Sequence, residues 1–475
     1  MKNINKFLLV LLFSFGIAFI GCEDRSDINV PPLNTGDADF SRFVVVGNSL
    51  SAAYQNGTLY ESSQKYSYGK LIADQVGTDF AQPYYSDPGA GGRLEIASFN
   101  ADGTPNIVPN PNKGVPTNLE YQAPYNNLGI PGEWLADALF ATDSNTCVTG
   151  QNGKPNPYFD LVLRGIGTQL QQAKMLHPTF VIFWLGNNDI LGYAAYGGTV
   201  AHNDVNTFTA LYSMALDTLA TTGAKVVVAN IPYVTATPYF TTIGPKVGLA
   251  IKDAVDAGLA VGVYYQKNGE IGPVPQTQFV DYNGLFNLDV ILTLGGSKYA
   301  ALIGQPTGKF YRDHGIADPS VLGIDTTKPF GLHPLNPYPD ALTLDADELA
   351  EIKTTIDGFN NAIATLAAAH NYPVVDINAF MNQVAANGYD ANGIHFTSAY
   401  ITGNTFSLDG VHPTSRGYAV VANLFIDKIN EVFNAEIPKI DVATVPNSIL
   451  LQGSAPVIKN GIPQVDESVM RKVLY

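Results

Sequence analysis

Four short runs of apolar, mostly β-branched residues constrain the fold of this chain more than any other feature. They span residues 43–46, 180–185, 225–229 and 373–377. Each run is almost continuously apolar rather than alternating, which is typical of strands that are covered on both faces. Longer helical patterns separate the runs. The sequence therefore predicts an α/β fold in which a parallel central sheet lies between layers of helices.

Two of the helical patterns are regular enough to place helices. After Asp345, apolar residues recur at spacings of three and four from Leu349 to Leu366, which draws one stripe along a helix. A second apolar stripe covers residues 421–432. We therefore expect a long helix in each of these stretches.

Two long stretches interrupt the alternation of strands and helices. Residues 83–125 are rich in proline, glycine, asparagine and tyrosine, and we expect a long ordered loop. Residues 233–343 mix loops with short apolar runs, and because structureless loops of this length are uncommon we interpret them as an inserted subdomain. Both insertions would belong to one domain, 40–440. A C-terminal extension, 441–475, would follow as a strap over the core or as a tail.

The first residues have the features of a secretory signal. Lys2 and Lys6 precede an apolar stretch, 7–20, which is short for a transmembrane helix and is followed by a glycine and Cys22. The segment resembles a bacterial lipoprotein signal, with Phe19 where that motif usually has leucine. An ordinary cleaved signal with an incidental cysteine is the alternative interpretation.

The resemblance to a lipoprotein signal implies that the mature chain is anchored through a lipid on Cys22. Residues 1–21 would be removed as the signal peptide, and the polar, acidic residues 22–39 would form a flexible tether. Such a lipid attaches a protein to a membrane while the rest of the chain stays in water. We expect an exported bacterial lipoprotein of the outer membrane, on either its periplasmic or its cell-surface face.

Charge and cysteine content argue against several functional classes. The chain has 42 acidic and 26 basic residues, which disfavours nucleic acid as a partner. Cys147 is the only cysteine besides Cys22, so an internal disulfide framework is not expected. The sequence has no histidine spacing typical of a metal site and no phosphate-binding glycine loop, so it predicts neither a metal nor another cofactor.

One candidate nucleophile follows the first apolar run. Ser49 comes directly after Gly47 and Asn48, where the predicted strand ends and a helical pattern opens. A serine at the carboxyl end of a central strand projects toward the edge where open α/β sheets bind ligands. At the start of a helix, its backbone N–H can also stabilise an oxyanion. Capping of the helix is the alternative role for Ser49.

A candidate base lies far away in the sequence. A serine hydroxyl needs a base within hydrogen-bond reach, and that imidazole needs an acceptor on its other nitrogen. His412 and Asp409 are three residues apart on a glycine-containing loop before a predicted helix, so Asp409 could supply the acceptor. A turn that caps the helix is the alternative.

Two further segments could stabilise negative charge on a reacting oxygen. Asn188 follows the second predicted strand, where its side-chain amide could donate a hydrogen bond. Gly129 and Gly132 precede a helix expected near Glu133, and glycines allow close approach of a backbone N–H. Ordinary turns would explain both segments equally well.

Together these four segments resemble the four sequence blocks of the SGNH/GDSL hydrolase family, in the same order. The blocks correspond to residues 47–50, 127–132, 186–189 and 409–412. The family has a flavodoxin-like three-layer α/β/α sandwich fold, which agrees with the alternation of strands and helices described above. Asn48 stands where the family signature usually has aspartate.

The resemblance implies a role for each residue. Ser49 would be the nucleophile, His412 the general base and Asp409 the residue that orients it. The N–H groups of Ser49 and Gly132 and the side chain of Asn188 would form the oxyanion hole. Gly129 is a less favoured choice for the glycine role.

We therefore expect a serine esterase that cleaves carboxylic esters through an acyl-enzyme on Ser49. The substrate is left open between a lipid acyl ester, which suits a membrane tether, and an acetylated glycan, which suits exported lipoproteins that process polysaccharides. The alternative is a catalytically silent lipoprotein that binds at the surface through a hydrolase scaffold.

Overall fold

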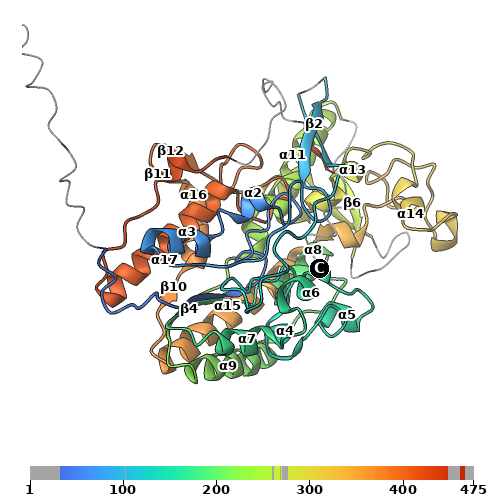
Figure 1. The fold of residues 1–475 in the computed structure, drawn as a ribbon. Coiled ribbons are helices and arrows are strands. Elements are labelled where there is room, and N and C mark those ends of the chain that lie inside the picture. The colour runs from blue at the N-terminus through green and yellow to red at the C-terminus, as the bar shows by residue number, and fades with distance from the viewer. Residues whose placement is uncertain are drawn as a thin grey trace, which may run out of the picture. The chain divides into compact units, whose positions relative to one another are not determined.

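The computed structural model describes residues 33–101, 103–258, 262–267, 269, 277–447 and 461–465 (Figure 1). The signal peptide, Cys22 and most of the expected tether lie outside these residues. By its internal contacts the chain divides into one unit of residues 1–34 and another of residues 35–475. Among the described residues, no helix has both the length and the apolar character needed to span a membrane.

A parallel four-stranded sheet lies at the centre of the fold. Its strands, in spatial order, are β1 (Phe43–Gly47), β4 (Phe180–Trp184), β5 (Lys225–Ala229) and β10 (Val374–Val375). All three neighbouring pairs are parallel, which confirms the parallel sheet predicted from the four apolar runs. The last strand is shorter than predicted because Asp376 caps the next helix, where its side chain accepts a hydrogen bond from the N–H of Ala379.

An irregular extended segment lies along the outer edge of β1. The N–H of Val45 donates to Asn126 O at 2.8 Å, and Leu128 N–H donates back to Val45 O at 2.9 Å. Ile130 N–H then donates to Gly47 O at 3.0 Å. With this segment counted as the second strand in the chain, the spatial order of the sheet becomes 2-1-3-4-5.

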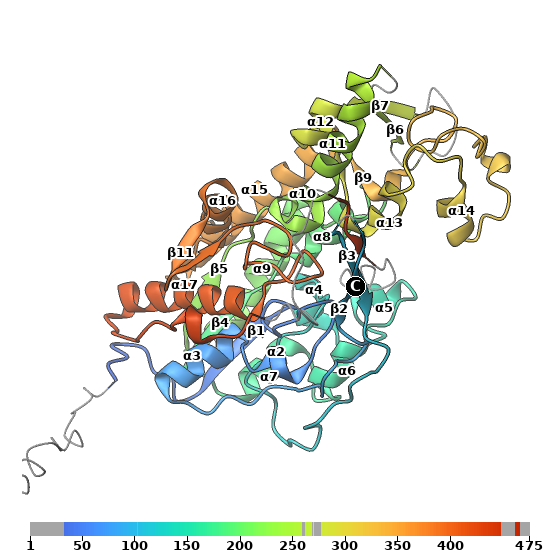
Figure 2. The same cartoon turned by 90° about the horizontal axis from the view of Figure 1, so that it is seen from above.

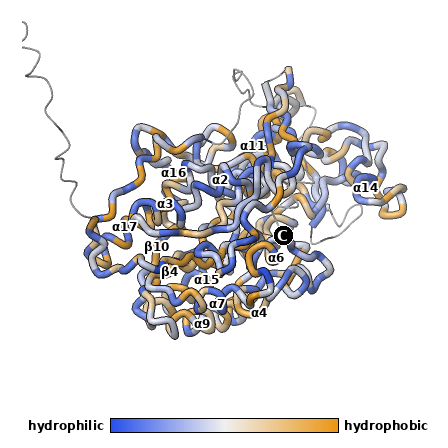
Figure 3. Tube along the Cα trace, viewed as in Figure 1, coloured by the Kyte–Doolittle hydropathy of each residue, from blue (hydrophilic) through white to orange (hydrophobic). Residues whose placement is uncertain are grey.

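Alternate residues of each central strand point to opposite sides of the sheet and enter two different hydrophobic clusters. Val44 and Val181 belong to one cluster, whereas Val45 and Ile182 belong to the other. Helices therefore pack on both faces, as Figures 1 and 2 show. In Figure 3, hydrophobic residues gather around β4, between α17 on one side and α9 on the other.

The helices on the two faces include those expected from the apolar stripes. The first face carries α7 (Gln169–Met175), α9 (Val205–Ala220) and α15 (Ala346–Ala369), and the second carries α3 (Tyr68–Val76) and α17 (Ser415–Phe433). The helix α15 begins at a capping box, in which the Asp345 side chain accepts from the N–H of Glu348 and the Glu348 side chain accepts from the N–H of Asp345. Both predicted long helices are confirmed.

The first long stretch contains strands that the sequence did not predict. β2 (Leu94–Phe99) and β3 (Pro105–Pro109) form an antiparallel hairpin, so the expectation of a long loop over 83–125 was wrong for this part. Leu94 and Ile96 are buried while the residues between and after them are more exposed, a two-residue alternation too short to recognise among the prolines and glycines. β13 (Gln464–Val465) pairs with β3, so this part of the C-terminal extension lies as a strap against the hairpin.

The second long stretch, 233–343, contains short helices and antiparallel strand pairs. These are α10 (Pro238–Thr241), α11 (Ile243–Asp256), β6 (Gly262–Gln266), β7 (Thr277–Asp281), α12 (Tyr282–Phe286), β8 (Ile291–Leu292), α13 (Ser297–Ala300) and α14 (Lys309–Asp313), and β8 pairs with β9 (Thr343–Leu344). Its buried residues, such as Val263 and Leu285, join the same hydrophobic cluster as Val44 of the central sheet. The stretch therefore packs onto the core of the main domain.

The remaining elements are short and mostly frame the site described next. They are α2 (Glu61–Gln64), α4 (Leu135–Phe140), α5 (Val148–Gln151), α6 (Pro157–Leu163), α8 (Asn188–Ala195), α16 (Ile377–Asn387), β11 (Tyr389–Ala391) and β12 (Ile394–Phe396).

Candidate active site

Ser49 lies in a turn directly after β1, at the carboxyl end of the sheet. The turn closes through hydrogen bonds from Ala52 N–H to Asn48 O at 3.0 Å and from Tyr54 N–H to Ser49 O at 3.0 Å. Gly47 is required before it, because a Cβ there would lie 2.1 Å from Ser51 Oγ. The helix expected to open at Ser49 does not form, since Ala53 has a left-handed backbone with φ of 57° that ends the turn.

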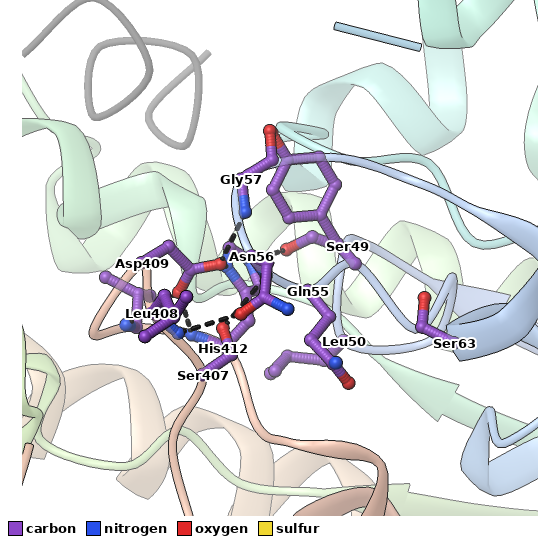
Figure 4. Close-up of polar contacts among 12 residues, drawn as sticks. Ser49, Leu50, Gln55, Asn56, Gly57, Ser63, Ser407, Leu408, Asp409 and His412 are labelled. Atoms are coloured by element: carbon purple, nitrogen blue, oxygen red, sulfur yellow. Dashed lines mark hydrogen bonds and ion pairs between the residues drawn. The ribbon is translucent and has the colours of Figure 1, made fainter. Parts of the chain in front are cut away.

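Ser49, His412 and Asp409 form a connected line of polar side chains (Figure 4). The Ser49 Oγ lies 2.9 Å from His412 Nε2, and His412 Nδ1 lies 3.3 Å from Asp409 Oδ2. All three residues are buried. The structure thus brings together a hydroxyl, an imidazole and a carboxylate that are up to 363 residues apart in the chain.

The surroundings of Asp409 favour its ionised form. Burial alone would raise the pKa of this carboxyl, but the charge of His412, its ring and backbone hydrogen bonds, and the N–H of Val411 together lower the pKa below the usual value. The N–H groups of Val411 and His412 donate to Oδ1 at 2.9 and 2.8 Å. Asp409 is therefore held as a carboxylate that faces the imidazole.

A contact that sequence reasoning missed joins the two halves of this line. The N–H of Asn56 donates to Ser407 Oγ at 3.0 Å, and the N–H of Leu408 donates to Asn56 Oδ1 at 2.9 Å. The N–H of Gly57 donates to Asp409 Oδ2 at 3.0 Å. We call these three bonds the Asn56–Gly57 clamp, which Figure 4 shows between the turn after Ser49 and the loop that carries His412.

The clamp depends on an unusual backbone conformation. Asn56 and Gly57 have φ values of 50° and 79°, both in the left-handed region. Asparagine and glycine are the residues that most readily adopt this conformation, and an Asn-Gly pair is a recognisable turn signal. The pair marks a turn in the sequence, but the partner of that turn lies about 350 residues away.

An aromatic ring supports the imidazole from the side. The ring of Tyr54 lies 4.7 Å from that of His412 between centroids, tilted by 51°. The carbonyl of Tyr54 accepts a hydrogen bond from the hydroxyl of Tyr418 at 2.7 Å, which ties this position to α17. Packing and hydrogen bonds together restrict rotation of the His412 side chain.

Donors suited to an oxyanion lie near the same sheet edge. Among the described residues, the N–H of Gly132 has no hydrogen-bond acceptor, and the N–H of Ser49 makes only the weak contact to the carbonyl of Ile130 that belongs to the bridge between Asn48 and Ile130. Asn188 Nδ2 donates one hydrogen bond to Glu133 O at 2.8 Å, which leaves its second hydrogen for another acceptor. By contrast, Gly129 N–H already donates to Asn127 Oδ1 at 3.0 Å, so of the two glycines only Gly132 has a free donor.

Buried side chains fix the positions of these donors. Asn48 Nδ2 donates to Asn187 Oδ1 at 3.2 Å, which links the turn of Ser49 to the start of α8. Asp189 accepts from Leu135 N–H at 3.0 Å, and burial raises the pKa of its carboxyl to about 6. Burial likewise raises the pKa of Glu133, whose carboxyl accepts a hydrogen bond from the side chain of Gln169.

Comparison with known proteins identifies a related sequence in the second half of the chain. The model of the GDSL-like lipase/acylhydrolase family matches residues 303–425. This range, about a quarter of the chain, includes Asp409 and His412, whereas Ser49, Gly132 and Asn188 precede it. The comparison with curated proteins finds no match. The family match supports a general esterase or acylhydrolase activity on small-molecule esters.

Proposed function

We propose that the chain hydrolyses carboxylic esters through an acyl-enzyme on Ser49. The observation that carries the proposal is the distance of 2.9 Å between Ser49 Oγ and His412 Nε2, with the carboxylate of Asp409 on the other ring nitrogen. Such an arrangement supplies an activated nucleophile, a base and an orienting acceptor. The family match over residues 303–425 adds independent support.

Each proton transfer of the proposed reaction can be assigned to a residue of the site. His412 Nε2 takes the hydroxyl proton as Ser49 Oγ attacks the ester carbonyl carbon and forms a tetrahedral intermediate. When the intermediate collapses, the bond from carbon to the alcohol oxygen breaks, and Nε2 returns the proton to that oxygen. Water then attacks the acyl-enzyme by the same route and releases the carboxylic acid. Asp409 stays ionised and stabilises the imidazolium that forms in each half of the cycle.

The proposed oxyanion hole consists of the N–H groups of Ser49 and Gly132 and the free hydrogen of Asn188 Nδ2. These donors are fixed by buried contacts before substrate arrives, which is the condition under which they stabilise a transition state most strongly. The choice of Gly132 over Gly129 is supported because the N–H of Gly132 is unused, whereas the N–H of Gly129 already donates to Asn127 Oδ1.

The finer description of the fold is also part of the proposal. A flavodoxin-like three-layer sandwich is supported by the 2-1-3-4-5 order, with the segment 126–130 as the second strand, and by the helices packed on both faces of the sheet. In such a sheet, ligands bind at the carboxyl ends of the strands, where Ser49 and Asn188 follow β1 and β4.

The nucleophile is tested by labelling the purified protein with a fluorophosphonate probe. The wild-type chain should be labelled and Ser49→Ala should not. Ser62→Ala is the matched control, because Ser62 is an exposed serine in the same part of the chain. Labelling that persists in Ser49→Ala would overturn the assignment. A wild-type chain that neither reacts with the probe nor hydrolyses any ester would favour the catalytically silent, surface-binding lipoprotein.

Anchorage and location are proposed from the sequence. The lipoprotein signal before Cys22 supports an exported protein attached to the outer membrane. Growth of expressing bacteria with an alkyne-tagged fatty acid should label the wild-type chain, and Cys22→Ser should abolish the label. Equal labelling of the two chains would refute lipidation at this cysteine without affecting the esterase proposal.

A further inference from the structure

A pocket of about 890 Å³ opens beside Asn188. Its walls come from the start of α8, the segment that follows α8, the α5 region and Trp134. Its lining includes Trp134, Asn188, Leu191, Gly192, Val200 and Asn203. Because Asn188 is also the proposed oxyanion donor, the pocket begins where the ester carbonyl would bind.

The chemistry of the walls favours an apolar occupant. Trp134, Leu191 and Val200 present an indole and two aliphatic side chains to the pocket. Several polar side chains of the wall are already bonded within the protein: Asn203 Nδ2 donates to Asp189 Oδ1 at 2.6 Å, and Asn152 Nδ2 donates to Val148 O at 3.0 Å. Lys154 and His202 also line the pocket, but the apolar part of its surface exceeds the polar part. A mostly apolar lining is typical of pockets that bind apolar ligands.

The position of the pocket relative to His412 identifies which part of an ester would enter it. The departing alcohol oxygen must reach His412 Nε2 to receive its proton. No lining residue of the pocket comes from the loop that carries His412 or from the Asn56–Gly57 clamp. All belong to the side of the site that supplies Asn188. The alcohol therefore leaves toward His412, and the acyl part extends into the pocket.

We propose that this pocket binds the acyl chain of the substrate, and that this chain is an aliphatic acyl group several carbons longer than acetyl. The inference rests on the proposed esterase function of Ser49 and specifies its substrate class. The volume of the pocket falls within the range of roughly 300–1,000 Å³ typical of small-ligand sites. An acetyl group would leave most of this apolar space in contact with water, whereas a longer chain would fill it.

Gly192 offers a way to close the pocket without disturbing the protein. It lies within α8 and lines the pocket, and a Cβ at this position would meet only Val200 Cγ2, at 3.8 Å. Its backbone is not in the left-handed region, so a larger residue is not strained there. Gly192→Phe should therefore place a ring in the space proposed for the acyl chain. Ala210→Phe is the matched control, since Ala210 is an exposed helical residue on α9.

The experiment compares kcat/KM for 4-nitrophenyl acetate and 4-nitrophenyl octanoate in the full chain. Even if each added methylene is only partly buried, wild-type kcat/KM should rise by at least about tenfold from acetate to octanoate. Gly192→Phe should reduce this octanoate-to-acetate ratio by about tenfold or more, while Ala210→Phe keeps the wild-type ratio. Circular dichroism and urea denaturation of Gly192→Phe report whether the variant is folded.

A binding measurement separates failure of this inference from failure of the esterase proposal. The chain has two tryptophans, Trp134 in the pocket and Trp184 buried in the sheet. In Ser49→Ala, decanoate should change the fluorescence of Trp134, and the added Gly192→Phe substitution should abolish the change. Binding without any ester hydrolysis would refute the esterase and retain the pocket assignment.

Two results would overturn the acyl-pocket assignment. One is Ser49-dependent hydrolysis with equal or greater activity on acetate, or on acetylated xylan, and no effect of Gly192→Phe on the octanoate-to-acetate ratio. Such a result would retain the esterase and indicate an acetylated glycan as its substrate. The other is the absence of any fluorescence response to decanoate in a folded Ser49→Ala chain.

Discussion

Replacing Asn56 by alanine tests whether the Asn56–Gly57 clamp aligns the proposed catalytic residues. The substitution removes Asn56 Oδ1, which accepts from Leu408 N–H at 2.9 Å, and Asn56 Nδ2, which donates to Tyr60 Oη at 3.0 Å. It retains the backbone hydrogen bond to Ser407. The loop that carries Asp409 and His412 would then be held to the Ser49 turn by fewer contacts.

The expected loss of stability follows from these groups. A buried N–H left without an acceptor costs about 1–3 kcal/mol, and Asn56 is 2% exposed. Alanine in the left-handed conformation of this residue, with φ of 50°, costs roughly a further 1–2 kcal/mol. We expect Asn56→Ala to lower the free energy of unfolding by about 2–5 kcal/mol in urea denaturation. Asn56→Gly removes the same side-chain bonds without the backbone strain.

The expected effect on catalysis separates alignment from stability. A displacement of about 1 Å between nucleophile and base costs on the order of 10²-fold in rate, so kcat should fall by roughly 10- to 100-fold in both Asn56 variants, with KM little changed. Asn423→Ala is the matched control. Asn423 is a buried asparagine that bonds the N–H and the carbonyl of Ile440 at 2.7 and 2.9 Å, away from the site. It should lose similar stability and keep wild-type kcat.

The assay is 4-nitrophenyl ester hydrolysis at a temperature and urea concentration at which all variants are folded. If Asn56→Gly retains wild-type kcat while it is destabilised, the clamp contributes to folding alone and the alignment argument is refuted. If Asn423→Ala loses as much kcat as the Asn56 variants, the loss reflects general destabilisation.

Three further predictions concern the site and its support. Asp409→Asn should lower kcat by about 10⁴-fold, because an amide cannot hold the imidazole in the required tautomer, and a loss under tenfold in stopped-flow or steady-state assays would contradict that role. Asn188→Ala should lower kcat by about 10²–10³-fold with KM nearly constant, and an equal rise in KM instead would indicate ground-state binding only. Burial raises the pKa of Asp137 from 3.8 to about 7, so its contribution to stability is complete below pH 3.8 and is lost as the pH rises through about 7. The urea midpoint of the wild type should therefore fall between pH 5 and pH 8 more steeply than that of Asp137→Asn, and identical slopes would show that this carboxyl does not titrate in that range.

The parts of the fold that the sequence predicted are those with strong local periodicity. The strands β1, β4 and β5 are continuous apolar runs because helices cover both faces of the sheet, and α15 begins at the capping box of Asp345 and Glu348. The prediction failed where the apolar pattern was too short to recognise, or where a helix cap ended a strand early. The hairpin of β2 and β3 has too few alternating residues to recognise, and the capping role of Asp376 shortens β10.

The sequence predicted those residues of the candidate site whose proposed role only a few types of side chain can perform. The hydroxyl of Ser49, the imidazole of His412 and the carboxylate of Asp409 are recognisable in the sequence because few side chains can perform these roles. The clamp could not be predicted, because the asparagine and glycine at 56 and 57 indicate a turn but not the distant segment to which that turn bonds. The preference for Gly132 over Gly129 came from the family resemblance, and the coordinates add a physical reason for it, because the N–H of Gly129 already donates to Asn127 Oδ1.

The separation of Ser49 from His412 has a consequence for the protein during synthesis. After the ribosome has added Ser49, it must add a further 363 residues before His412 is present, and the clamp cannot form until Ser407 and Asp409 have been added. If Ser49 and His412 act as proposed, a nascent chain is inert toward esters for most of its elongation. Proteolytic removal of the region beyond residue 400 would leave the Ser49 hydroxyl without His412 in the same way, even in a fragment that keeps the first strands folded.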